Sequence, residues 1–105
     1  MSTKQQNDSD VETVSIERIK TDQPKQYKVL LLNDDYTSMD FVVSVLESIF
    51  KKSPAEAVQI MLHVHQKGRG ECGIFARQIA EAKIAQVHER ARAAGFPLRC
   101  VMEEI

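Results

Sequence analysis

The spacing of apolar residues divides the chain into an N-terminal arm and an ordered region. Residues 1–24 contain no aromatic residue, and their few aliphatic side chains are scattered among polar and charged ones. Such a segment buries too little apolar surface to offset the entropy lost on ordering. We therefore expect a disordered arm over residues 1–24 and one folded domain over residues 25–105.

The ordered region begins with a short and nearly continuous apolar run, QYKVLLLN (26–33). Such runs are typical of buried strands. After it, apolar residues recur at steps of three and four from Met39 to Phe50, which predicts an amphipathic helix. Thr37 or Ser38 can serve as its N-cap.

A second helix start lies in the sequence SPAE (53–56). Ser53 can accept a hydrogen bond as the N-cap, Pro54 suits the first helical position, and Glu56 completes a capping box. The apolar periodicity of this helix ends at Gly68, a residue type common just after a helix.

The remaining third predicts a strand, a helix and a second strand. ECGIFA (71–76) favours a short strand in which Gly73 indicates a bulge or close packing. One apolar face from Gln78 to Ala94 predicts a helix, and LRCVMEEI (98–105) closes the chain as a strand. The order β-α-α-β-α-β indicates an α+β domain, with three helices packed on one face of a three-stranded antiparallel sheet.

Composition narrows the function classes. The 105 residues are 43% hydrophobic and 28% charged with a net charge of -1, so no excess positive charge favours nucleic acid or an anionic membrane. The apolar runs are too short to span a bilayer. Two cysteines make no disulfide framework, and no export signal precedes them. We expect a cytoplasmic protein with reduced thiols, and nothing requires more than a monomer.

The first apolar run ends in Asn33, Asp34 and Asp35, which could belong to a small metal- or nucleotide-dependent enzyme. A nucleotide site needs a phosphate loop, but GRGECG (68–73) lacks the GxxxxGK[ST] pattern and leads into a strand. A magnesium site of the response-regulator kind needs a further Asp on a later strand, and neither later strand has one. This enzyme is the weaker alternative.

Histidine and cysteine chemistry is also weakly supported. His63 and His65 are two positions apart on a helix and point about 200° apart, whereas chelating pairs use steps of three or four. Cys72 and Cys100 resemble small buried hydrophobic residues more than nucleophiles. We therefore expect no metal and no cofactor.

The polar residues at the end of the first strand can be interpreted in two ways. Asp34 and Asp35 can be turn or capping residues, and His65 can be a core-edge histidine bonded to a carbonyl. If the strand end and the second helix converge, however, Asn33, a carboxylate and His65 form a set of acceptors suited to an ammonium. Because apolar residues lie beside them, this set would fit the N-terminal residue of a peptide.

Four stretches in this order resemble the ClpS family: NDDYTSMDFVVSVLESIF, IMLHVHQKGRGECGIF, IAEAKIAQV and FPLRC. The likeness covers roughly residues 26–104. It implies a non-enzymatic adaptor of the ATP-dependent Clp protease in the bacterial N-end rule. Such an adaptor binds substrates that begin with Phe, Leu, Tyr or Trp, called N-degrons. It delivers them to the ClpA unfoldase for degradation by the ClpP peptidase, and so modulates which substrates ClpAP degrades.

The resemblance also implies roles for individual residues. Asn33, Asp34 and His65 would hold the α-ammonium, with Asp34 acting partly through water. Asp35 and Thr37 would support the pocket rim and the first peptide bond. The hydrophobic pocket would be walled by five residues, with the first excluding β-branched N-termini: Met39, Val42, Met61, Val64 and Leu98.

The resemblance places a docking surface for the N-terminal domain of a ClpA-type AAA+ unfoldase around RQIAEAKIAQ (77–86). Gln78 and Lys83 are its matched positions, and the N-terminal arm would assist delivery. The chain departs from the family pattern twice. Ser38 replaces a helix-start proline and can cap instead, whereas Gln78 replaces a glutamate and leaves the strength of docking open.

Overall fold

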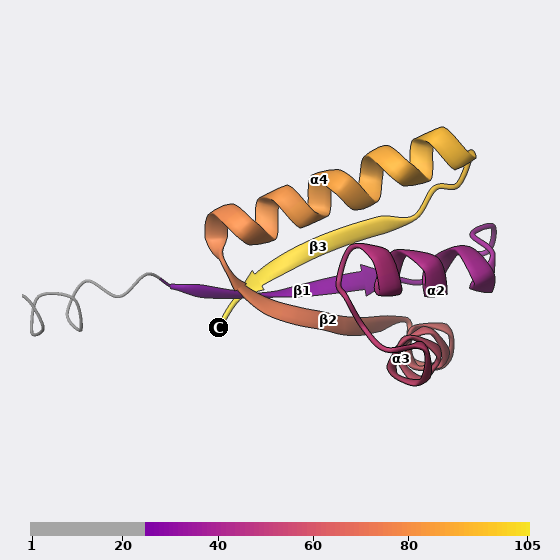
Figure 1. The fold of residues 1–105 in the computed structure, drawn as a ribbon, viewed down its shortest axis with the longest axis horizontal. Coiled ribbons are helices and arrows are strands. Elements are labelled where there is room, and N and C mark those ends of the chain that lie inside the picture. The colour runs from indigo at the N-terminus through magenta and orange to yellow at the C-terminus, as the bar shows by residue number, and fades with distance from the viewer. Residues whose placement is uncertain (1–24) are drawn as a thin grey trace, which may run out of the picture.

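The computed structural model describes residues 25–105, which form a three-stranded sheet and three helices (Figure 1). The predicted α+β class and β-α-α-β-α-β order are confirmed. The arm predicted over residues 1–24 lies outside the described residues. The elements are β1 (Gln26–Leu32), α2 (Met39–Ser48), α3 (Pro54–Lys67), β2 (Arg69–Ala76), α4 (Arg77–Ala94) and β3 (Arg99–Glu104).

β1 is the central strand, and both of its neighbours run antiparallel to it in the order β2-β1-β3. Its last residue, Leu32, lies opposite Arg69 on one side and Arg99 on the other. β2 therefore begins two residues before the predicted start, because Arg69 and Gly70 find partners on β1 that the local sequence does not reveal.

The pairing of β1 with β2 contains an irregularity near Gly73. Val29 pairs with Gly73 and Leu30 pairs with Glu71, so Cys72 is an extra residue on β2. A side chain on Gly73 would meet the Phe75 ring, since an added Cβ would lie 2.7 Å from its nearest carbon. The bulge and the close packing expected from Gly73 are thus both present.

The predicted helix caps are confirmed. Ser38, and not Thr37, caps α2 and accepts a hydrogen bond from the Phe41 amide at 3.1 Å. Ser53 and Glu56 form the full capping box at the start of α3. Gly68 ends α3 in the left-handed conformation with φ of 92°. The bonds at the two N-caps, Ser38 and Ser53, satisfy backbone N–H groups that have no partner within their helices.

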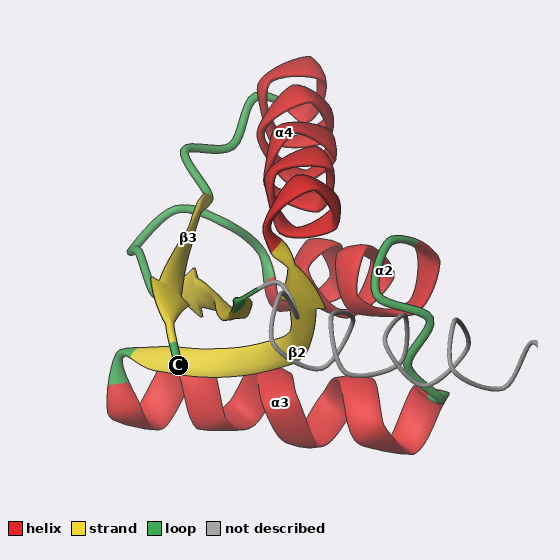
Figure 2. Ribbon diagram, turned by 90° about the vertical axis from the view of Figure 1, so that its left-hand side faces the viewer, coloured by secondary structure: helices red, strands yellow, loops and turns green. Residues whose placement is uncertain are grey.

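The core lies between the sheet and the helices. Figure 2 shows α2 and α4 on one side of the sheet and α3 running alongside β2. Val29 and Leu31 on β1 are fully buried and pack with Leu46 of α2 and Val87 of α4 in one cluster. Within residues 25–105, no helix combines the length and the apolar character needed to cross a membrane.

His88 of α4 provides a hydrogen-bond acceptor for a backbone N–H of the edge strand β3. The Cys100 amide donates a hydrogen bond to Nε2 of His88 at 3.0 Å, so this nitrogen carries no proton. Burial, followed by the charges of Arg99 and Arg92, lowers the pKa of His88 from its ordinary value of 6.5. The folded chain therefore favours the neutral imidazole.

This preference predicts a pH-dependent stability. As the pH falls below 6.5, the unfolded chain binds a proton at this position before the folded chain does. The free energy of unfolding should therefore decrease until the pH has passed the lowered pKa of His88. Urea denaturation between about pH 7.5 and pH 5 measures this decrease.

His88→Gln is the control, because its amide oxygen can still accept the Cys100 amide but does not titrate. The variant should lose less stability over the same range, since the other described histidines, His63 and His65, remain in both proteins. Equal losses in the two proteins would contradict the assignment.

Candidate functional site

The C-terminal ends of β1 and α3 meet at one hydrogen bond. The backbone N–H of Asn33, just after β1, donates a hydrogen bond to the Gly68 carbonyl at 2.9 Å. Arg69, the residue after Gly68, is already paired with Leu32 of β1. His65 lies nearly one turn before Gly68, so it is brought next to the polar residues that follow β1.

A cavity of about 210 Å³ lies where these segments converge with α2. This volume suits a single side chain better than a drug-sized ligand, for which pockets of about 300–1,000 Å³ are typical. The cavity has a polar side and an apolar side. Its lining consists of Asn33, Asp34, Asp35, Thr37, Met39, Val42, Met61, Val64 and His65.

These nine residues were all singled out from the sequence, and the structure brings them together. Leu98 is the predicted wall residue that does not line this cavity. Its side chain is 3% exposed, packs in the core and borders a second cavity beside α4. Its place in the pocket wall therefore stays a prediction.

The apolar side of the cavity is built from residues of different exposure. Val42 and Val64 are buried at 7% and 3% exposure, whereas Met39 is 46% exposed and Met61 is half-buried. The valines are therefore fixed by the core, and Met39 is the wall residue most open to solvent. A ligand's apolar group would contact both a rigid surface and an adaptable one.

Asp34 holds the loop that carries the polar side. Its carboxylate accepts from the Tyr36 amide at 2.8 Å, the Thr37 amide at 2.7 Å and the Thr37 hydroxyl at 2.7 Å. Partial burial raises the pKa of this carboxyl, but the bonds from Thr37 and Tyr36 outweigh that effect and the pKa is lowered overall. Asp34 is thus both a turn residue and a fixed negative charge in the cavity.

This arrangement predicts that Thr37→Val raises the pKa of Asp34, because it removes the hydroxyl that favours the charged carboxylate. NMR titration of the Asp34 side-chain carboxyl measures the change. Thr37→Ser keeps a hydroxyl and should leave the pKa near that of the unchanged chain. The same pKa in the valine and serine variants would show that the hydroxyl does not hold the carboxylate.

Cys72 and Cys100 are buried free thiols, and burial raises the pKa of Cys100 to about 12 and that of Cys72 still further. His63 borders a different hollow from His65. Residues 25–105 contain no group of three or more His, Cys, Asp or Glu side chains placed to hold a metal ion.

The two predicted docking residues have different surroundings. Gln78 is exposed in the first turn of α4. Lys83 is half-buried, and its ammonium donates to the Ile49 carbonyl at 2.9 Å, just after α2. It also lies 5.9 Å from the ring centre of Phe50 and 5.4 Å from that of Phe75. Lys83 therefore ties α4 to α2, a role that no local pattern indicated.

Comparison with known proteins finds consistent relatives. The family model described as "ATP-dependent Clp protease adaptor protein ClpS" matches residues 22–101. The ClpS adapter protein of Oleidesulfovibrio alaskensis is 61% identical over 83 residues, which cover 79% of this chain and 80% of the relative. That of Wolinella succinogenes is 52% identical over 96 residues, which cover 91% and 94% of the two chains.

A solved structure is also similar. Agrobacterium tumefaciens ClpS2, determined bound to L-phenylalaninamide, has a TM-score of 0.77 and 38% sequence identity to this chain. The match covers 79% of this chain and all of the other. The shared fold therefore extends over nearly all of the described residues.

Proposed function

This chain belongs to the ClpS family of Clp protease adaptors, and we propose that it binds the N-terminal residue of N-degron substrates and delivers them to a ClpA-type unfoldase. Proteins of this family are adaptors and not enzymes. The preferred N-terminal residues are bulky and hydrophobic: Phe, Leu, Tyr and Trp.

The observation that carries the proposal is a set of hydrogen-bond acceptors beside an apolar wall in one small cavity. A peptide's α-ammonium has three donors and no acceptor. The amide oxygen of Asn33, the carboxylate of Asp34 and the imidazole of His65 can satisfy it. Since three donated bonds already use much of the Asp34 carboxylate, its contact with the ammonium runs partly through water.

We assign to the remaining pocket residues the roles that the family resemblance implies. Asp35 and Thr37 support the rim and the first peptide bond, while the substrate side chain enters between Met39, Met61 and the two buried valines. L-Phenylalaninamide, the molecule bound to the related ClpS2, combines a free amine with an aromatic side chain. That likeness supports a hydrophobic N-terminal residue as the ligand of this pocket.

The expected affinity is moderate. Burying a Leu or Phe side chain contributes roughly 1.5–3 kcal/mol. Hydrogen bonds to a charged ammonium add about 1.5–3 kcal/mol each before the costs of desolvation and ordering. Once these costs are subtracted, we expect a Kd in the micromolar range or somewhat tighter, which suits an adaptor that must release its substrate.

We predict that a fluorescent peptide beginning with Phe binds, and that the same peptide with an acetylated N-terminus does not. Acetylation removes the positive charge and two of the three donors, so the acceptor set is left without a partner. Fluorescence anisotropy measures both peptides, with and without EDTA and ATP. Equal binding of the free and acetylated peptides would contradict the proposal, and dependence on ATP or metal would favour the enzyme alternative.

Met39→Ala tests specificity in the same assay. A wall near Cβ penalises Val and Ile by overlap while leaving room for γ-branched Leu. The variant should therefore gain affinity for peptides beginning with Val or Ile relative to Leu. Peptides that differ only in their first residue provide the matched comparison.

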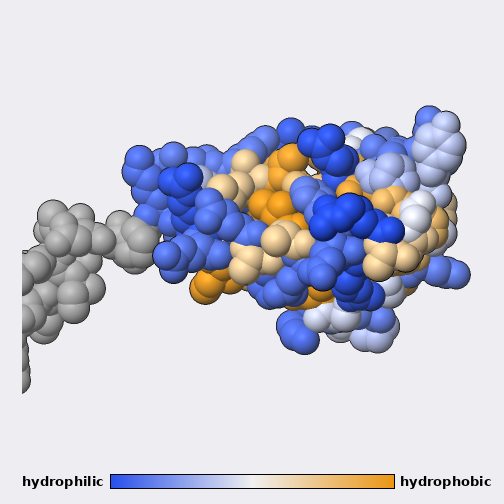
Figure 3. Space-filling model, turned by 90° about the horizontal axis from the view of Figure 1, so that it is seen from above, coloured by the Kyte–Doolittle hydropathy of each residue, from blue (hydrophilic) through white to orange (hydrophobic). Residues whose placement is uncertain are grey.

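Delivery requires a surface for the unfoldase, and we place it on the N-terminal half of α4. Gln78 is exposed there, and the side chain of its neighbour Ile79 is 51% exposed. In the space-filling view from the side of α4, apolar residues lie among hydrophilic ones (Figure 3). An apolar patch with a polar border is typical of a protein interface. The arm over residues 1–24, outside the described part, would assist delivery.

We predict that Ile79→Asp weakens binding to the isolated N-terminal domain of a ClpA-type unfoldase at least tenfold, because it puts a charge into the apolar contact. Surface plasmon resonance measures this binding. Ile74→Asp is the control, since Ile74 is an isoleucine of β2 with 46% exposure. Equal weakening by both variants would contradict the placement. Lys83 is a poor test site because it also bonds to α2.

A further inference from the structure

Two exposed apolar side chains of α3 continue the wall of the candidate pocket onto the outer surface. Val58 is 42% exposed and Leu62 is 40% exposed. With Met61 and His65 they occupy positions i, i+3, i+4 and i+7, which lie on one face of a helix. Since Met61 and His65 line the pocket, Val58 and Leu62 form an apolar strip beside its opening.

The apolar strip lies away from the surface that we assign to the unfoldase. In Figure 2, α3 lies below β2 and α4 stands above it. A partner bound to the N-terminal half of α4 therefore leaves the strip open. The candidate pocket, at about 210 Å³, accommodates one side chain, so the rest of a bound peptide must lie on the surface that adjoins its opening.

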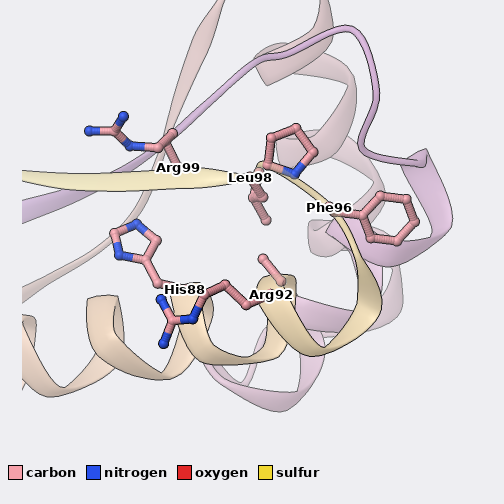
Figure 4. A pocket seen from close by; sticks show the side chains of 7 residues that line it. His88, Arg92, Phe96, Leu98 and Arg99 are labelled. Atoms are coloured by element: carbon pink, nitrogen blue, oxygen red, sulfur yellow. The ribbon is translucent and has the colours of Figure 1, made fainter.

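The second cavity, of about 370 Å³ beside the C-terminal end of α4, has no such connection to the candidate pocket. The two share no lining residue. In Figure 4, Arg99 extends away from α4 whereas Arg92 lies along it, so their charged groups do not converge on one ligand. Continuity with the pocket is thus a property of the strip on α3, and it indicates which molecule reaches that strip.

The path of a bound peptide follows from where its α-ammonium is held. The proposed acceptors Asn33, Asp34 and His65 lie where the C-terminal end of α3 meets the end of β1. A peptide anchored there leads away from that end, and Met61 and then Val58 follow at successive turns back along α3.

The spacing of an extended peptide selects its third residue for the strip. Successive side chains of an extended chain point to opposite sides, so the first and third residues face the same surface. The third residue lies about 7 Å beyond the first. One helical turn is about 5.4 Å long. A first side chain against Met61 therefore places the third one on Val58 and Leu62.

We propose that the apolar strip of α3 binds the third residue of the substrate and favours a large aliphatic side chain there. This inference rests on the proposed function, because the ammonium must be held in the pocket for the third residue to lie over the strip. The substrates are then selected at their first and third residues, and the second residue points away from the strip.

Three fluorescent peptides test the position: Phe-Ala-Leu-Gly-Lys, Phe-Leu-Ala-Gly-Lys and Phe-Ala-Ser-Gly-Lys, each labelled on the lysine side chain. The first two have the same composition and differ only in the place of Leu. Because the strip buries only part of the third side chain, we expect the first peptide to bind roughly fivefold more tightly than the other two. Fluorescence anisotropy with the full chain measures the three Kd values. Equal values for the first two peptides would overturn the proposal.

A protein variant locates the effect on α3. Leu62→Gln should reduce the advantage of Phe-Ala-Leu-Gly-Lys to about twofold or less, since it replaces an apolar contact by a polar side chain that still favours a helix. Ile74→Gln is the matched control, because Ile74 lies on β2 with 46% exposure and lines neither cavity. An advantage that survives Leu62→Gln, or that both variants remove, would contradict the assignment.

The acetylated form of Phe-Ala-Leu-Gly-Lys separates failure of this inference from failure of the proposed function. If the free peptides bind, the acetylated one does not, and the place of Leu has no effect, the pocket stands and the role of the strip is overturned. If the acetylated and free peptides bind equally, or none binds, the ammonium does not anchor the chain and both proposals are overturned.

Discussion

The hydrogen bond from the backbone N–H of Asn33 to the Gly68 carbonyl is the constraint on which the candidate site depends. It joins the end of the central strand to the end of α3, and the pairing of Leu32 with Arg69 continues the contact. Gly68 can turn the chain from α3 into β2 because its backbone is left-handed, a conformation that costs other residues about 1–2 kcal/mol. An added Cβ would meet no atom within 4 Å, so glycine is required there by conformation and not by space.

The Asp34 carboxylate shows why a structural role and a binding role do not exclude each other. An ionised carboxylate offers about four lone-pair sites, and three donors from Tyr36 and Thr37 already bond to it. These bonds fix the loop that carries Asn33 and Asp35. The carboxylate keeps its full charge, since its pKa is lowered. It can therefore act on an ammonium through the electrostatic field even where direct contact is limited.

The sequence predicted those features whose causes are local. The Ser53–Glu56 capping box, the Ser38 cap and the Gly68 helix end each depend on residues within one turn of the chain. The residues of the candidate pocket were recognisable because their types are chemically complementary, and because they resemble a known family. The sequence alone did not show that the end of the first strand and the end of the second helix meet. That follows from the pairing register of β1 and β2.

The features that the sequence did not predict depend on partners distant in the chain. β2 begins at Arg69 because β1 offers partners there, and Leu98 borders a different cavity from the one expected for it. The bond from Lys83 to the Ile49 carbonyl joins α4 to α2, which no apolar periodicity can indicate. Residue types limit which long-range contacts are possible, but the packing of the helices and strands determines which of them form.

The α2 helix links the two cavities of this small domain. At its first turns it supplies Met39 and Val42 to the candidate pocket, while Phe41, which lies between them in the sequence, packs on Phe96 of the second cavity. Its C-terminal end is held by Lys83. A pocket wall fixed at both ends would lose little conformational freedom on binding a ligand, so more of the contact energy would remain as affinity. That preorganisation therefore depends on Lys83 of α4 and on Phe96 after it, as well as on the pocket residues themselves.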